Sequence, residues 1–133
     1  MQVSVAALDA DGVTLRAPLA PSINHRDTVF GGSASAVAIL AAGSLLHTRM
    51  RAEGLAARLV IQSNTMDYLL PIQGDFTARS ALSEADQWPR FLRTFARMGR
   101  ARLRVTARLE SDGRMAGRLT GEFVALSTTT PER

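Results

Sequence analysis

Apolar and polar residues alternate at period two near both ends of the chain and follow a helical period mainly in the middle. Positions 3–18 alternate around a turn at Asp11-Gly12, which predicts a β-hairpin. A helix is expected from about Ser33 to Arg51. Its apolar positions lie on almost every side, which predicts a helix enclosed by other elements.

The second half of the chain predicts four longer strands. Extended patterns cover residues 59–70, 76–82, 102–109 and 115–126. Between the second and third of these, apolar residues from Phe91 onward recur at helical spacing, which predicts a short amphipathic helix or turn.

One helix that is apolar all round needs a sheet that curls around it. The sequence therefore predicts the α+β class, with an antiparallel sheet wrapped around one long central helix in a single domain, 1–133. Such a sheet has free edges, and pairing these edges between subunits is a common way to cover them. We therefore expect a homodimer or a dimer of dimers.

Composition narrows the chemistry that the chain can perform. It has 46% hydrophobic residues and 21% charged residues, as globular proteins do. It has no Cys, which excludes disulfides, thiolate metal sites and thiol nucleophiles. The uncharged stretch 28–46 is rich in Ala, Gly and Ser, so we expect a buried helix here rather than a membrane span. We also expect a cytoplasmic protein.

All 16 positively charged side chains are arginines, and seven of them lie between Gln87 and Leu109, where there is no acid. The net charge of +4 comes from this segment, which an anionic partner would be expected to meet. The same arginines also fit an ordinary solvated face of a strand and a short helix. Nucleic acid is not expected as a partner, because only 5% of residues are aromatic and no binding motif is present.

Three stretches of the chain resemble a known family. They are residues 24–33 (NHRDTVFGGS), 68–75 (YLLPIQGD) and 99–103 (GRARL). Together they resemble the hot-dog fold, and more narrowly the thioesterase-like proteins of the YiiD C-terminal type, which are related to PaaI-like acyl-CoA thioesterases. The resemblance implies hydrolysis of acyl-CoA or a related acyl thioester, with coenzyme A as part of the substrate and no metal or tightly bound cofactor.

Hydrolysis of a thioester needs a polarised carbonyl group. Backbone N–H groups at a helix N-terminus are free donors at the positive end of the helix dipole. Gly31 and Gly32 would let a substrate approach closely, so the N–H of Gly32 or Ser33 is our candidate oxyanion donor. The alternative is that the glycine pair only makes a tight turn into the helix.

Two loop residues are candidates for handling water. The resemblance implies that Asn24 orients the water or the thioester, and its amide offers both a donor and an acceptor. His25 would be a base because its pKa lies near neutrality. The alternatives are an Asn that stabilises the loop and an exposed or structural His. His47, late in the helix, is expected to be structural.

The chain departs from the PaaI-like pattern at two places. Phe30 stands where many of these enzymes have a His before the glycine pair. The central helix of those enzymes also carries an Asp or Glu about two turns after that pair. Here the helix has no acid until Glu53, so the usual carboxylate base is missing.

The long strand 59–70 offers substitutes for that base. Strict alternation would put Ser63, Thr65 and Asp67 on the same face as Leu59 and Ile61. Asp67 is our candidate base, supplied from a partner subunit across a dimer interface; the alternative is an Asp paired with an Arg. The remaining substrate-binding candidates hydrogen-bond water, line the acyl tunnel or hold the coenzyme A phosphates: Ser63, Thr65, Phe30, Met66, Tyr68, Arg100 and Arg102.

Two other functions stay open. A hot-dog β-hydroxyacyl dehydratase normally needs a loop His and a carboxylate on the helix, and the helix lacks the carboxylate. A non-catalytic protein that binds acyl-CoA or another acyl ligand would not need that carboxylate at all.

Overall fold

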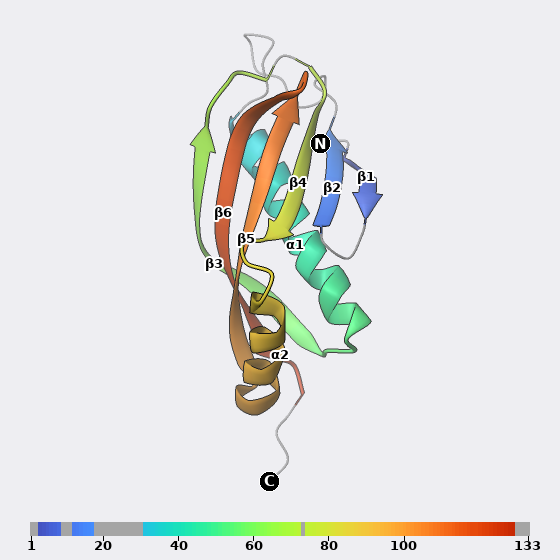
Figure 1. Ribbon diagram of the computed structural model, residues 1–133, viewed down its shortest axis with the longest axis vertical. Coiled ribbons are helices and arrows are strands. Elements are labelled where there is room, and N and C mark those ends of the chain that lie inside the picture. The colour runs from blue at the N-terminus through green and yellow to red at the C-terminus, as the bar shows by residue number, and fades with distance from the viewer. Residues whose placement is uncertain (1–2, 9–11, 18–30, 73, 130–133) are drawn as a thin grey trace.

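The computed structural model describes residues 3–8, 12–17, 31–72 and 74–129. Six strands and two helices follow one another in the order β1 (Ser4–Leu8), β2 (Gly12–Ala17), α1 (Gly31–Ala52), β3 (Ala57–Tyr68), β4 (Phe76–Leu82), α2 (Gln87–Met98), β5 (Arg100–Ser111) and β6 (Arg114–Ser127). The strands form one antiparallel sheet in the order β1-β2-β4-β5-β6-β3, so β1 and β3 are its edges. This is the predicted α+β arrangement, and α1 lies across one face of the sheet (Figure 1).

Helix α1 and one face of the sheet share a single hydrophobic core. Buried side chains alternate along β5 and β6 with exposed or half-buried ones, as expected for strands that are covered on one side. Ser80 is the polar side chain in this core, and its Oγ donates a 2.7 Å hydrogen bond to the carbonyl oxygen of Ala41. This bond fixes α1 against β4.

The apolar pattern predicted that α1 is enclosed on all sides. In the structure the sheet covers only one side of this helix. Val37, Ala41 and Leu45 are fully buried, but Leu40 is 45% exposed and His47 is exposed. The alanines of the buried side let the helix backbone lie close to the sheet. Together with exposed apolar residues such as Leu40, they make the sequence of this helix apolar on almost every side. None of the helices in the described ranges is long and apolar enough to cross a membrane.

Helix α2 lies beside β5 near the end of α1, at the lower end of the sheet in Figure 1. Its aromatic residues Trp88, Phe91 and Phe95 stack in sequence and are buried. The Arg49 guanidinium lies 4.7 Å from the centre of the Trp88 ring, which ties α2 to α1. The helix ends at Gly99, whose φ of 72° is easily adopted by glycine.

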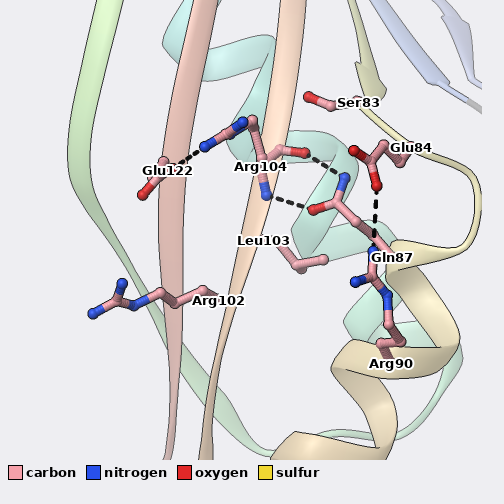
Figure 2. A pocket seen from close by; sticks show the side chains of 8 residues that line it. All are labelled: Ser83, Glu84, Gln87, Arg90, Arg102, Leu103, Arg104 and Glu122. Carbon is pink, nitrogen blue, oxygen red and sulfur yellow. Dashed lines mark hydrogen bonds and ion pairs between the residues drawn. The ribbon is translucent and has the colours of Figure 1, made fainter.

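Strand β4 leaves β5 after Leu82, and a side chain of α2 takes over its hydrogen bonds. The Gln87 amide nitrogen donates to the Arg104 carbonyl oxygen at 3.1 Å, and the Gln87 amide oxygen accepts from the Arg104 N–H at 2.8 Å. Figure 2 shows both bonds. The Arg104 carbonyl oxygen also accepts from the Ser83 N–H at 3.2 Å, so Gln87 and Ser83 together satisfy the Arg104 peptide groups where β4 ends.

A β-bulge in β3 reverses one prediction about this strand. Ile61 pairs with Phe123, but Ser63 pairs with Glu122, so Gln62 is an extra residue. Because of this residue, Ser63, Thr65 and Asp67 lie on the opposite face from Leu59 and Ile61 rather than on the same face. The strand also ends at Tyr68, before the predicted limit of residue 70.

Candidate functional site

An apolar pocket of about 300 Å³ lies at the first turn of α1. Ala34, in that turn, forms part of the wall. The other lining residues come from the end of β3, the segment after it and the adjoining parts of β5 and β6: Tyr68, Leu69, Leu70, Pro71, Ile72, Leu109 and Ala116. The pocket therefore joins an apolar lining to the end of the helix where backbone N–H groups have no intrahelical acceptor.

The segment after β3 folds back to form one wall of this pocket. The N–H groups of Leu69 and Leu70 both donate to the carbonyl oxygen of Ala116, at 2.8 and 3.1 Å. Pro71 has no N–H to extend the ladder, and Ile72 turns inward, where it is 5% exposed. Leu69 and Leu70 stay half-exposed beside the pocket.

A second, more polar hollow of about 400 Å³ adjoins the apolar pocket. The two share Leu70, Pro71 and Ala116. The second hollow adds Ser111, Asp112 and Arg114 from the turn between β5 and β6. Asp112 makes this tight turn with a φ of 53°. We call the two hollows together the helix-end site: an apolar compartment with a charged and polar mouth.

The residues predicted as oxyanion donors, Gly32 and Ser33, come directly before Ala34 of the pocket wall in the chain. Helix α1 begins at Gly31, which puts Gly32 and Ser33 in its first turn, next to Ala34 of the pocket wall. A helix N-terminus carries a partial positive charge, which favours negative charge developing on a nearby carbonyl oxygen. The predicted site residues Asn24, His25 and Phe30 lie outside the described residues.

Two predicted substrate-binding residues of β3 lie at or next to the pocket. Tyr68 lines it and is 57% exposed. Met66 is on the same face, and its methyl group would lie 3.0 Å from a Cβ atom built on Gly117. Gly117 pairs with Tyr68, so the absence of a side chain there leaves room for Met66 and Leu109 behind the pocket.

Ser63, Thr65 and Asp67 lie away from the helix-end site of their own chain. All three are on the face opposite α1 because of the β3 bulge. Asp67 pairs with Arg118, with 3.4 Å between the carboxylate and the guanidinium. Both side chains are about half-exposed, so this is a surface ion pair of small energetic weight.

Arg100 and Arg102 are also far from the helix-end site. Both line a different hollow at the start of β5. Arg102 precedes Leu109 of the apolar pocket by seven strand residues, which is about 23 Å along β5. Arg102 is also on the opposite face of the sheet. Within one chain, the structure does not bring these arginines to the pocket.

Sequence reasoning missed most of the pocket lining and the charged group at its mouth. The extended pattern over 59–70 predicts that Leu69 and Leu70 belong to the strand, although Pro71 directly after them signals a chain that leaves the sheet. The gap between the strands predicted for 102–109 and 115–126 implies a turn, but which element the far side of this turn reaches depends on the fold. Arg114 follows this turn and lines the mouth. No group of three or more His, Cys, Asp or Glu in the described ranges could hold a metal ion.

Comparison with known proteins identifies a family. The model of the family YiiD_C, described as "Putative thioesterase (yiiD_Cterm)", matches residues 1–127. No curated protein matches the chain.

Solved structures share the fold. A protein of unknown function from Chlorobaculum tepidum is 25% identical with a TM-score of 0.88, over 95% of this chain and 83% of that one. A structure described as a putative thioesterase from Shewanella oneidensis is 21% identical with a TM-score of 0.84, over 95% and 85%. A mutant of phenylacetic acid degradation protein PaaI from Thermus thermophilus is 20% identical with a TM-score of 0.69, over 93% and 92%.

Proposed function

Because the chain belongs to the YiiD_C family of putative thioesterases and has the hot-dog fold, we propose that it hydrolyses acyl-CoA or a related acyl thioester at the helix-end site. The observation that carries this proposal is the apolar pocket whose wall includes the first turn of α1. An acyl chain fits the apolar lining, and its thioester carbonyl would then lie near the helix N-terminus.

In the proposed reaction, a water oxygen attacks the thioester carbon and the carbonyl oxygen becomes negatively charged. The N–H groups of Gly32 or Ser33 stabilise this oxyanion. The intermediate then expels the thiolate, which is a good leaving group because a thiol has a pKa of about 8.5. The products are a carboxylic acid and coenzyme A or another thiol.

The water must lose a proton during the attack. We propose that the Asn24 amide orients the water and that His25 or Asp67 accepts the proton. Asp67 would have to come from a second chain, because in its own chain it lies on the face opposite α1. Phe30, Met66 and Tyr68 would contact the acyl chain.

We also propose that the mouth of the site binds the anionic part of the substrate. Arg114 lines this mouth, and a guanidinium binds phosphate groups well. Arg114 is thus better placed in its own chain than Arg100 or Arg102, whose contact with coenzyme A phosphates remains a prediction that needs a second chain.

Edge strand β3 supports the proposal of a dimer. It has 12 residues, pairs with β6 on one side, and exposes 42% of Val60. A long unprotected edge of this kind pairs readily with another strand. We propose that two copies pair along β3, and that the substrate lies in a groove shared by both chains.

The size of the particle in solution tests the dimer. Sedimentation should give twice the chain mass of 14.3 kDa. Ser63→Arg is an informative variant, because Ser63 faces Glu122 within its own chain and lies near the midpoint of β3. If the two-fold axis of the dimer passes near this midpoint, the new Arg would lie close to its own copy. Like charges facing each other weaken strand pairing, so the variant should be less dimeric than the wild type. A fully monomeric wild-type protein would contradict this proposal.

A binding protein without catalytic activity is the second candidate. It is favoured by one observation: none of the residues found to line the apolar pocket is an acid or a His. Such a protein would hold an acyl thioester without hydrolysing it.

One experiment separates the two candidates. Wild type and Asn24→Ala are incubated with acyl-CoAs of increasing chain length while released thiol is measured, and binding is measured by calorimetry. The thioesterase proposal predicts turnover by the wild type and at least a hundredfold lower kcat for the variant, with similar affinity. Tight binding with no thiol released by either protein would favour the binding protein. If the protein neither binds nor hydrolyses any of these acyl-CoAs, both candidate functions are contradicted.

A further inference from the structure

A trough lies on the sheet face opposite α1, away from the helix-end site of the same chain. It consists of two hollows, of about 300 and 480 Å³, that share Arg102. Gln87 and Arg90 of α2 line the first hollow, while Thr94 and Met98 line the second. The trough therefore follows α2 for about 17 Å, at 1.5 Å per helical residue. Figure 2 shows the first hollow.

The trough has an excess of positive charge. Arg90 pairs with Glu84 at 3.3 Å, and Arg104 pairs with Glu122 at 2.7 Å. For four more arginines in or next to the trough, no carboxylate of the described residues lies within ion-pair distance: Arg93, Arg97, Arg100 and Arg102. The segment that supplies them contains no acid from Gln87 to Leu109. An anionic ligand is thus favoured here.

Apolar groups accompany these charges. Met98 is 57% exposed at the end of α2. Val124 and Leu126 are half-buried on β6 and line the second hollow with it. A ligand that fits the trough must therefore present both apolar and negatively charged groups.

We propose that the trough is a docking site for an acidic amphipathic helix of a partner protein. A small ligand is usually enclosed in a concave pocket. This trough instead extends along α2 for about 17 Å, and it is lined by Met98 of that helix and by the unpaired Arg100 and Arg102 of β5, which fits a groove that binds another helix. Such a helix would place its apolar side on Met98 and Val124 and its carboxylates near Arg100 and Arg102.

Fluorescence anisotropy with a synthetic peptide tests this proposal. The probe is a labelled helical peptide of about 18 residues, with Leu at i, i+4 and i+7 on one side and Glu beside them. A scrambled peptide of the same composition has the same charge but no apolar side. We expect the wild-type protein to bind the amphipathic peptide at least tenfold more tightly than the scrambled one.

Three variants locate the binding. Arg102→Glu should weaken peptide binding at least tenfold. Glu122→Gln removes a negative charge and frees the Arg104 guanidinium, so it should strengthen binding several-fold. Arg16→Glu is the matched control, because Arg16 is exposed on β2, three strands away from β6. It makes the same charge change as Arg102→Glu and should leave binding unchanged. Circular dichroism and urea unfolding establish that each variant is folded.

Several results would overturn the proposal. Equal binding of the two peptides would show attraction by charge alone. Equal weakening by Arg102→Glu and Arg16→Glu would show that the peptide does not bind in the trough. Displacement of the peptide by micromolar adenosine 3′,5′-bisphosphate would assign the trough to a small anion. None of these measurements needs thioester hydrolysis, so they do not depend on the proposed activity.

Discussion

Asp67 pairs with Arg118 across the β3–β6 ladder, and their side chains form a 3.4 Å ion pair on the face that points away from α1. The sequence left two roles for this carboxylate, a base or the partner of an arginine. The ion pair is observed, whereas the role as a base stays a prediction.

The substitution Asp67→Asn separates these roles. If His25 accepts the proton, kcat should fall less than tenfold, because Asp67 then takes no part in the reaction and its exposed ion pair contributes little to stability. Rates are measured with a saturating acyl-CoA. A fall of a hundredfold or more, without a change in the oligomeric state, would instead assign Asp67 as the base supplied by the partner chain.

Ala34→Leu tests the location of the acyl chain. Ala34 is 3% exposed and lines the apolar pocket, so three added carbon atoms would shorten the space for the substrate. We expect the preferred acyl chain to become shorter, with kcat/KM for long chains lowered at least tenfold. The measurement is kcat/KM over a series of chain lengths. An unchanged chain-length profile would place the acyl chain elsewhere.

Arg114→Gln tests the proposed contact with the anionic part of the substrate. We expect KM for acyl-CoA to rise five- to fiftyfold while kcat changes little, because the contact is the same in the ground and transition states. The control substrate is the matching N-acetylcysteamine thioester, which has no phosphate. An equal rise of KM for both substrates would contradict the assignment.

Gly117→Val tests the packing behind the pocket. A Cβ atom at this position would lie 3.0 Å from the Met66 methyl group and 3.2 Å from both the Asp67 carbonyl oxygen and a Leu109 methyl group. We expect the free energy of unfolding to fall by about 1–3 kcal/mol, as measured in urea. Gly43→Ala is the matched control, since a Cβ there meets nothing within 4 Å. Its expected effect is stabilisation by up to about 1 kcal/mol, because alanine favours a helix over glycine.

Acid should weaken the ion pair between Arg104 and Glu122. The hydrogen bond and the charge of Arg104 hold the pKa of Glu122 below its ordinary value of 4.5. The pair therefore contributes stability above that value, and the contribution is lost as the pH falls through the lower pKa of the folded state. Between pH 6 and pH 3, wild type should lose more stability in urea unfolding than Glu122→Gln. Identical pH profiles would show that the pair has no such effect.

The sequence predicted the order of the elements well, because period-two and helical patterns report directly on burial. The β3 bulge was not predictable in the same way. Gln62 is one polar residue among several, and only its pairing with β6 reveals that it is extra. This one residue decides on which side of the sheet Asp67 lies.

The candidate site was predictable at its helix and less so elsewhere. The Gly31-Gly32 pair and the following apolar run mark a helix start in the sequence itself. Leu109 and Arg114, in contrast, come to this helix through the β5–β6 hairpin, which is far from it in the chain. Such contacts depend on strand order, which local patterns do not contain.

The two hydrogen bonds from Gln87 to Arg104 have a consequence for solubility. Strand β4 ends at Leu82, opposite Val105, so the part of β5 before Val105 would otherwise expose peptide groups without hydrogen-bond partners. Strands of other molecules attach to such groups and start aggregates. The Gln87 carboxamide and the Ser83 N–H cover the Arg104 peptide groups at the start of this segment without an additional strand. A substitution that removes the Gln87 carboxamide should therefore increase aggregation at high protein concentration before it lowers the melting temperature.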